Sequence, residues 1–136
     1  MACFVVGGAE AVVVSAVRHV VKKRELEQGV IDAEGKQLTE VSEEGYCLTR
    51  KLGWLASMLW GGVALLCIEH IWHGEVVLYP PFLTAMTNAA DTAEMLYEMS
   101  TVGVGMCALV TCVWAIACFV ADAVAKHAGS AAGNEA

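Results

Sequence analysis

Hydrophobic residues in this chain gather into three long runs that are separated by two polar stretches. Residues 52–68 and 100–121 contain no charged residue, and residues 2–21 are apolar apart from Glu10, Arg18 and His19. Because a helix rises about 1.5 Å per residue, roughly 17 to 25 apolar residues span the hydrocarbon core of a bilayer. The pattern therefore predicts an all-α protein with three transmembrane helices.

Signals at the ends of these runs suggest where each helix begins and ends. Pro80 and Pro81 cannot continue a helix, whereas Asn88 or Asp91 offers an N-cap for the third helix. We expect a single membrane domain with a first helix at about 2–28, a polar cytoplasmic loop at about 29–50, a second helix at about 51–73, an outer Pro-Pro loop at about 74–90, a third helix at about 91–127 and a loose tail at 128–136.

The first apolar run is expected to remain a membrane helix. In a cleaved secretory signal the basic residues precede the apolar run, whereas Lys22, Lys23 and Arg24 follow it here. A water-soluble helical bundle is the other interpretation. It is disfavoured because its third helix, apolar on every side, would need too much protein to cover it.

The positions of the positive charges predict the orientation in the membrane. All eight Lys and Arg residues lie near the end of the first helix, in the following loop, at the start of the second helix or just after the third. Three crossings place them on one side, and the positive-inside tendency makes that side cytoplasmic. We therefore expect the N-terminus outside and the C-terminus inside.

Composition narrows the class of protein further. Hydrophobic residues make up 57% of the chain and charged residues 17%, as expected for a multi-pass protein of an inner or plasma membrane that contacts the lipid bilayer. The net charge is −7, so the chain has no excess of basic residues with which to bind the phosphates of a nucleic acid. Nucleic acid is therefore excluded as a partner. No phosphate loop, nucleophile elbow, kinase or hydrolase signature occurs, so an enzyme is the less favoured class.

Small residues recur at helical spacing in the apolar runs. The pairs are Ser57 with Gly61, Gly103 with Cys107, and Gly7 with Ala11. Small residues four positions apart allow helix backbones to approach closely in lipid. Because three helices bury little surface by themselves, we expect the chain to form a homo-oligomer or to pack beside another membrane subunit.

Candidate chemistry is densest after the second apolar run, where residues 69–75 read EHIWHGE. On a helix, His70 and His73 share one face, and Glu69 shares the adjoining face with His73. The start of the third helix adds two acids that are four residues apart. Imidazole and carboxylate ligands suit a divalent metal ion such as Zn, Fe, Mn or Ni. The predicted metal site comprises His70, His73, Glu69, Glu94 and Glu98.

A simpler interpretation of this cluster stands beside the metal site. Histidines and acids at the water boundary often only terminate a hydrophobic span, and acids in a first helical turn interact favourably with the helix dipole. The spacing also matches neither HExxH nor the Glu-x-x-His pair of di-iron bundles, since Trp72 stands three residues after Glu69.

Glu10 is the second candidate because it falls about halfway along the first apolar run. An ionisable side chain inside a membrane is costly, so this intramembrane ionisable residue indicates a function or a buried partner. The alternative is that the first span starts later and leaves Glu10 in water.

The function that these features predict is a binding or transport component. It would be a small oligomeric membrane protein whose outer acidic and histidine-bearing face binds a cation, with a divalent metal ion as the cofactor, or handles protons. One alternative is a structural accessory subunit of a larger membrane complex. Another is a redox subunit that binds haem or a quinone, although two histidines three residues apart cannot ligate opposite faces of one haem.

Overall fold

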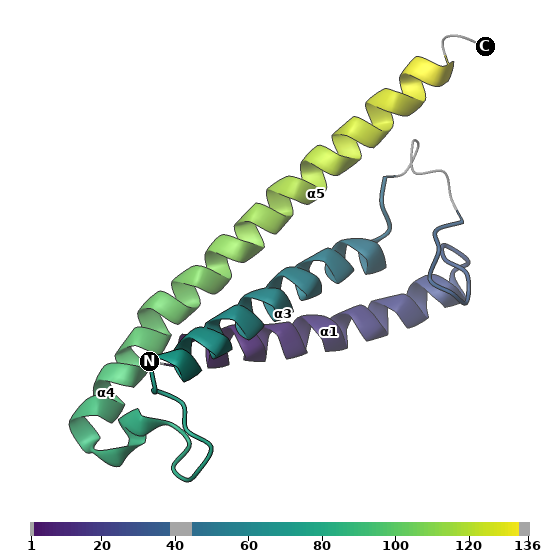
Figure 1. Ribbon diagram of the computed structural model, residues 1–136. Coiled ribbons are helices and arrows are strands. Elements are labelled where there is room, and N and C mark those ends of the chain that lie inside the picture. Colours follow the sequence, from purple (N-terminus) through teal and green to yellow (C-terminus); the bar gives the residue numbers. More distant parts are fainter. Residues whose placement is uncertain (1, 39–44, 134–136) are drawn as a thin grey trace. The chain divides into compact units, whose positions relative to one another are not determined.

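A computed structural model describes residues 2–38 and 45–133, and its path is helical throughout the three apolar runs (Figure 1). Three helical stretches of this described part are long and apolar enough to cross a membrane. The all-α class and the three candidate spans are confirmed. The elements are α1 (Cys3–Glu27), α3 (Leu48–Trp72), the short 3-10 helix η1 (Thr84–Thr87), α4 (Ala89–Glu98), the π-helix η2 (Met99–Gly103) and α5 (Val104–Gly133).

Large apolar side chains on these helices point outward. Leu65 on α3 is 72% exposed and Phe119 on α5 is 79% exposed. In the third candidate span, Ala89–Ala131, large side chains such as Ile116 and Val124 are 65% and 62% exposed. Such exposure is unfavourable in water and expected in lipid, because the hydrocarbon of the bilayer then covers the apolar surface. The chain is thus a small multi-pass membrane protein.

The ends of the third helical stretch differ from the expected 91–127. Asn88 is the N-cap, and its Oδ1 accepts a hydrogen bond from the Asp91 backbone N–H at 2.9 Å, so the helix begins at Ala89. At the other end α5 continues to Gly133, because its last turns are rich in alanine, the best helix former. The expected loose tail is helical as far as Gly133, and residues 134–136 lie outside the described chain, as do residues 39–44 of the expected loop.

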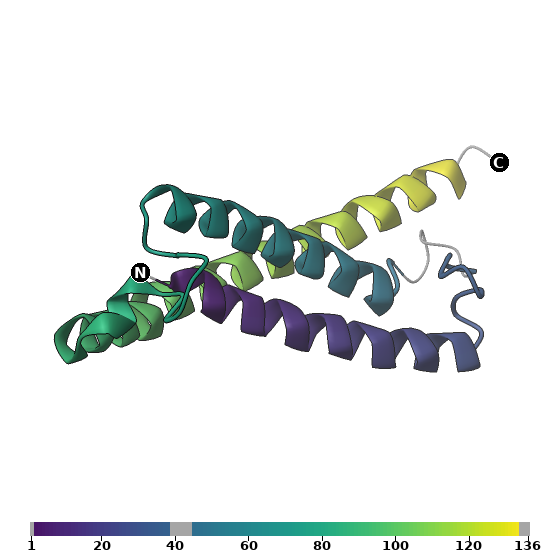
Figure 2. The same ribbon diagram turned by 60° about the horizontal axis from the view of Figure 1, so that its bottom comes forward.

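The described chain divides into two compact units. The first unit comprises Met1–Val12 and Ser57–Val110, and the second comprises Val13–Ala56 and Thr111–Ala136. In the first unit Gly7 of α1 faces Val63 of α3, and in the second unit Arg18 of α1 bonds Thr49 of α3. Helices α1 and α3 are therefore neighbours in both units (Figure 2).

Glycine allows close helix packing in the first unit. A methyl group added to Gly7 would lie 3.2 Å from Cγ2 of Val63, and one added to Gly103 would lie 3.0 Å from Cγ2 of Val6. Both distances are too short for ordinary contact, so a larger residue would push the helices apart. Gly103 is also the last residue of the π-helix, a form that occurs mostly as a local bulge within α-helices.

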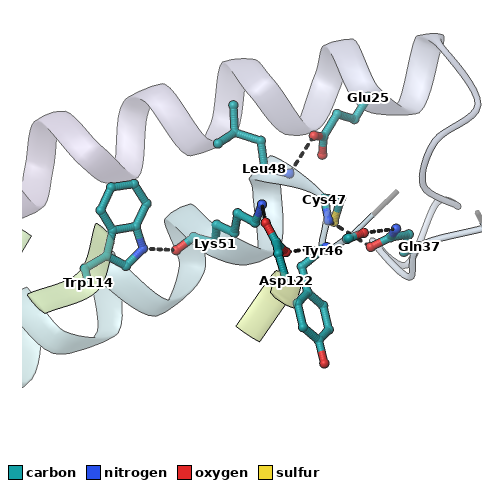
Figure 3. A network of polar contacts seen from close by, with 9 residues as sticks. Glu25, Gln37, Tyr46, Cys47, Leu48, Lys51, Trp114 and Asp122 are labelled. Atoms are coloured by element: carbon teal, nitrogen blue, oxygen red, sulfur yellow. Dashed lines mark hydrogen bonds and ion pairs between the residues drawn. The ribbon is translucent and has the colours of Figure 1, made fainter. Parts of the chain in front are cut away.

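Polar bonds connect the elements of the second unit (Figure 3). Asp122 on α5 accepts hydrogen bonds from the Lys51 ammonium group and from the Tyr46 backbone N–H. Glu25 on α1 caps the start of α3, where its two carboxylate oxygens accept from Leu48 N at 2.9 Å and Thr49 N at 3.2 Å. These bonds tie the start of α3 to both other helices.

Further bonds in this network fix the segment before α3. The Gln37 side chain donates to the Gly45 carbonyl and accepts from the Cys47 backbone N–H, each at 2.8 Å (Figure 3). The Trp114 indole N–H on α5 donates to the Lys51 carbonyl at 2.7 Å. Gly45 has a left-handed φ of +82°, and a methyl group there would lie 2.8 Å from an Asp122 oxygen. Glycine is therefore required at this position.

Candidate functional site

A hollow of about 270 Å³ in the first unit is lined by three of the five residues of the predicted metal site. Glu69, His70 and His73 come from the end of α3, and Glu75 follows in the loop. Glu94 and Glu98 lie on α4 and do not line the hollow. The full lining is Cys3, Leu66, Glu69, His70, His73, Glu75, Val102 and Met106.

His70 is the histidine that the fold holds in place. His70 is only 8% exposed, and its ring packs edge-on against the Phe4 ring of α1, with the two ring centres 5.4 Å apart. The ring Nδ1 lies 2.7 Å from the Leu66 carbonyl oxygen. Because a carbonyl only accepts, Nδ1 carries a proton and the neutral ring leaves a lone pair on Nε2.

Glu75 faces that lone pair. Its Oε2 oxygen lies 3.7 Å from His70 Nε2, close enough for an ion pair once the ring is protonated. The turn that brings Glu75 back depends on Gly74, whose φ is +70° and which ends the helix as a C-terminal glycine commonly does. The Glu75 backbone N–H then donates to the His70 carbonyl at 3.0 Å.

Sequence reasoning did not include Glu75 in the predicted site. The signal was present in Gly74, since a glycine directly after a helix commonly reverses the chain over the last turn. The loop beyond supports the position further, because the Glu75 carbonyl accepts hydrogen bonds from the Thr84 backbone N–H at 3.0 Å and from the Thr84 hydroxyl at 3.2 Å. His70 thus lies at the end of α3, and Glu75 lies in a loop whose backbone is fixed by hydrogen bonds to Thr84.

The ligand-type side chains of the predicted metal site are not gathered around one point. Within residues 2–38 and 45–133, no group of three or more His, Cys, Asp and Glu side chains lies close enough together to hold a metal ion. His73 is exposed, in contrast to His70, and Glu94 is exposed on α4. The predicted five-residue metal site therefore stays a prediction.

Glu10 lies in the same unit, on α1. Its Oε2 oxygen is buried, and the side chain hydrogen-bonds the Cys107 thiol of α5. Cys107 lines a cavity of about 50 Å³ whose walls are otherwise mostly apolar. This cavity and the hollow share Cys3, Leu66 and Met106 in their linings. The His70–Glu75 pair, the cavity, the Cys107 thiol and Glu10 are thus linked by residues of a single unit.

Comparison with known protein families, with curated proteins and with solved structures found no match for this chain. Function is therefore argued from the chemistry of the site alone, because a helical membrane fold by itself hosts many unrelated functions.

Proposed function

We propose that this small multi-pass membrane protein takes up and releases protons at His70 and Glu75, as a binding or transport component. The observation that carries the proposal is a buried imidazole whose Nε2 faces a carboxylate at 3.7 Å in the hollow. Histidine is the side chain whose charge ordinarily changes between about pH 5 and 8. Nε2 of His70 is a proton acceptor, and the facing carboxylate would stabilise the charged ring.

The proton binds at Nε2 because Nδ1 already donates to the Leu66 carbonyl. The charged ring then forms an ion pair with Glu75, and both side chains need only small movements to reach hydrogen-bonding distance. Release of the proton restores the neutral ring. The packing against Phe4 keeps the ring in one orientation in both states.

We propose that a proton released from His70 moves on to Glu10, which is the second proton-binding residue. A charged carboxylate is costly in hydrocarbon, so a proton taken up there lowers the cost of its burial. The cavity of about 50 Å³ beside Cys107 shares three lining residues with the hollow, so the proposed path from the hollow to Glu10 passes along this cavity.

In the proposed membrane orientation, the hollow lies on the outer side of the membrane. The segment of residues 69–98 carries no Lys or Arg, whereas all eight cations lie elsewhere in the chain. By the positive-inside tendency the cationic segments are cytoplasmic, the N-terminus is outside and the C-terminus inside. The membrane is an inner or plasma membrane in this proposal.

Proton flux into liposomes tests the proposal directly. Purified protein is reconstituted with a pH-sensitive dye inside the vesicles, and an inward pH gradient is imposed. We expect His70→Gln and Glu75→Gln to reduce the protein-dependent flux at least about tenfold, as loss of a proton-transfer group commonly does. His73→Gln is the matched control, because His73 lines the same hollow but is exposed, and it should retain most of the flux.

Two results would contradict the proposal. One is a wild-type flux no greater than that of protein-free liposomes. The other is an equal loss in His70→Gln and His73→Gln. Glu10→Gln tests the second proton-binding residue and should also remove the flux, whereas Glu34→Gln in the exposed loop removes one acid elsewhere and should not.

A divalent metal ion in the same hollow is the second candidate. Four ligand-type side chains line it, namely Glu69, His70, His73 and Glu75, and at least three of them would have to move together to hold an ion, because no such group is assembled in the described residues. Elemental analysis of protein purified in mild detergent, before and after addition of Zn²⁺, tests this candidate against the double variant His70→Ala and His73→Ala. Stoichiometric metal in the parent protein alone supports it, and no bindable metal in the parent excludes it.

Association with a second copy or with another membrane subunit is proposed for the outward surface of α3. Gly61 has no protein atom within 4 Å of the position of an added methyl group, and Trp60 beside it is 47% exposed. Together with Ser57 one turn earlier, Gly61 allows close approach of another helix. Native mass spectrometry of the wild type and of Gly61→Leu tests this. If another helix packs at Gly61, the wild type should show the mass of the complex and Gly61→Leu should show that of the single chain.

A further inference from the structure

A run of positively charged side chains follows the C-terminal half of α1 in the second unit. Two hollows of about 180 Å³ and 340 Å³ adjoin there and share His19 and Lys22. We call them together the basic groove. Among the residues that the structure describes, no carboxylate lines either hollow. The lining comprises Ser15, Arg18, His19, Lys22, Lys23 and Leu26.

The fold holds Arg18 in the groove. The Arg18 Nε–H donates to the Thr49 carbonyl on α3 at 3.3 Å. Its guanidinium group packs on Gly53, where an added methyl group would lie 3.3 Å from Cζ, Nε and Nη2. Because Nε is already bonded, the terminal nitrogens are left to bind an anion, and a guanidinium is well suited to phosphate oxygens.

Lys22 is positioned by a second glycine. A methyl group on Gly35 would lie 3.4 Å from Lys22 Cε and 3.5 Å from Nζ, so the loop after α1 covers the lysine stem. Glu25, the next acid along α1, directs both of its oxygens to the backbone of Leu48 and Thr49. That carboxylate is therefore occupied in capping α3 and is not part of the groove.

We propose that the basic groove binds the phosphate headgroup of an anionic membrane phospholipid. The charge of the groove is complementary to such a headgroup, although the chain as a whole carries a net charge of −7. The groove begins where the apolar part of α1 ends, which is where headgroups lie. The proposal is independent of proton uptake at His70.

Native mass spectrometry from nanodiscs tests the lipid site. Discs containing equal amounts of phosphatidylglycerol and phosphatidylcholine are loaded with the full-length protein, and the lipids retained after release are counted. We expect wild type to retain phosphatidylglycerol and the double variant Arg18→Gln and Lys22→Gln to lose that preference by roughly tenfold or more. The control Lys36→Gln and Lys126→Gln removes the same charge outside the groove and should keep the preference.

Gly53→Ala gives a second test that leaves every charge in place. The added methyl group displaces the Arg18 guanidinium and should reduce retention of phosphatidylglycerol, while circular dichroism reports whether the helices remain. The proposal is overturned if wild type shows no preference, if the control pair loses as much as the groove pair, or if Gly53→Ala folds normally and retains lipid fully. Complete displacement by inorganic phosphate would also overturn it, because the site would then recognise free phosphate.

Discussion

The two units of this protein use polar residues in opposite ways. In the second unit the Asp122 carboxylate is hydrogen-bonded to Lys51 and to the Tyr46 backbone, and both Glu25 oxygens are bonded to the start of α3. In the first unit His70 and Glu75 face each other at 3.7 Å, beyond hydrogen-bonding distance. Fully bonded groups stabilise a structure, whereas groups that are close but not bonded retain the capacity to bind.

Apolar packing stabilises the first unit, whereas hydrogen-bonded polar side chains stabilise the second. The first unit relies on close approach at Gly7 and Gly103 and on apolar contacts among Ala2, Ala85 and Met95. These contacts position the hollow without using its polar side chains. In the second unit the polar side chains themselves hold the loop and the helices together, so substitutions there should affect stability first.

Asp122→Ala should have the largest effect on stability. It removes the bonds from Lys51 and from the Tyr46 backbone, and we expect a loss of about 2 kcal/mol, as for hydrogen bonds to a charged group. Urea unfolding in mild detergent, followed by circular dichroism, measures it. In the double variant with Lys51→Ala the two losses should not add, and strict additivity would show that the pair does not interact.

Gly103→Ala should have the next largest effect. The added methyl group would lie 3.0 Å from Val6 Cγ2, and overpacking of this kind costs about 1 to 3 kcal/mol. Gly105→Ala is the matched control two residues later, where nothing lies within 4 Å, and it should be neutral or slightly stabilising. Equal behaviour of the two variants would contradict the close packing of α1 against η2 in the first unit.

Thr49→Val should have the smallest effect, and in the opposite direction. Thr49 is 4% exposed, and within the described residues its hydroxyl oxygen is buried without a hydrogen-bond partner. Replacement by an apolar group of the same shape should stabilise the protein by about 1 kcal/mol, because an unsatisfied hydroxyl is costly to bury. A clear loss of stability would show that the hydroxyl does bond in the folded protein.

The sequence alone predicts the helices well because lipid imposes a simple requirement. Long uncharged runs must be helical so that their backbone groups are bonded, and Asn88 marks the start of the third helix by its side chain. The π-helix η2 is not predictable in this way, because it accompanies the contact of Gly103 with α1.

The candidate site was predicted only in part. The cluster at residues 69–75 identified His70, but the partner Glu75 depends on the turn at Gly74, and the acids of α4 do not line the hollow. The Lys51–Asp122 bond joins residues 71 positions apart, and neither residue stands in a motif. Pairs of this kind follow from tertiary packing rather than from local pattern.

We propose that the three helices cross a bilayer with the cationic segments inside and the His70–Glu75 hollow outside. The most direct test treats sealed, right-side-out vesicles with a membrane-impermeant amine reagent and maps the labelled lysines by mass spectrometry. The account predicts that Lys22, Lys23 and Lys36 react only after the membrane is permeabilised. Labelling of these lysines in sealed vesicles, at the rate seen after permeabilisation, would contradict it.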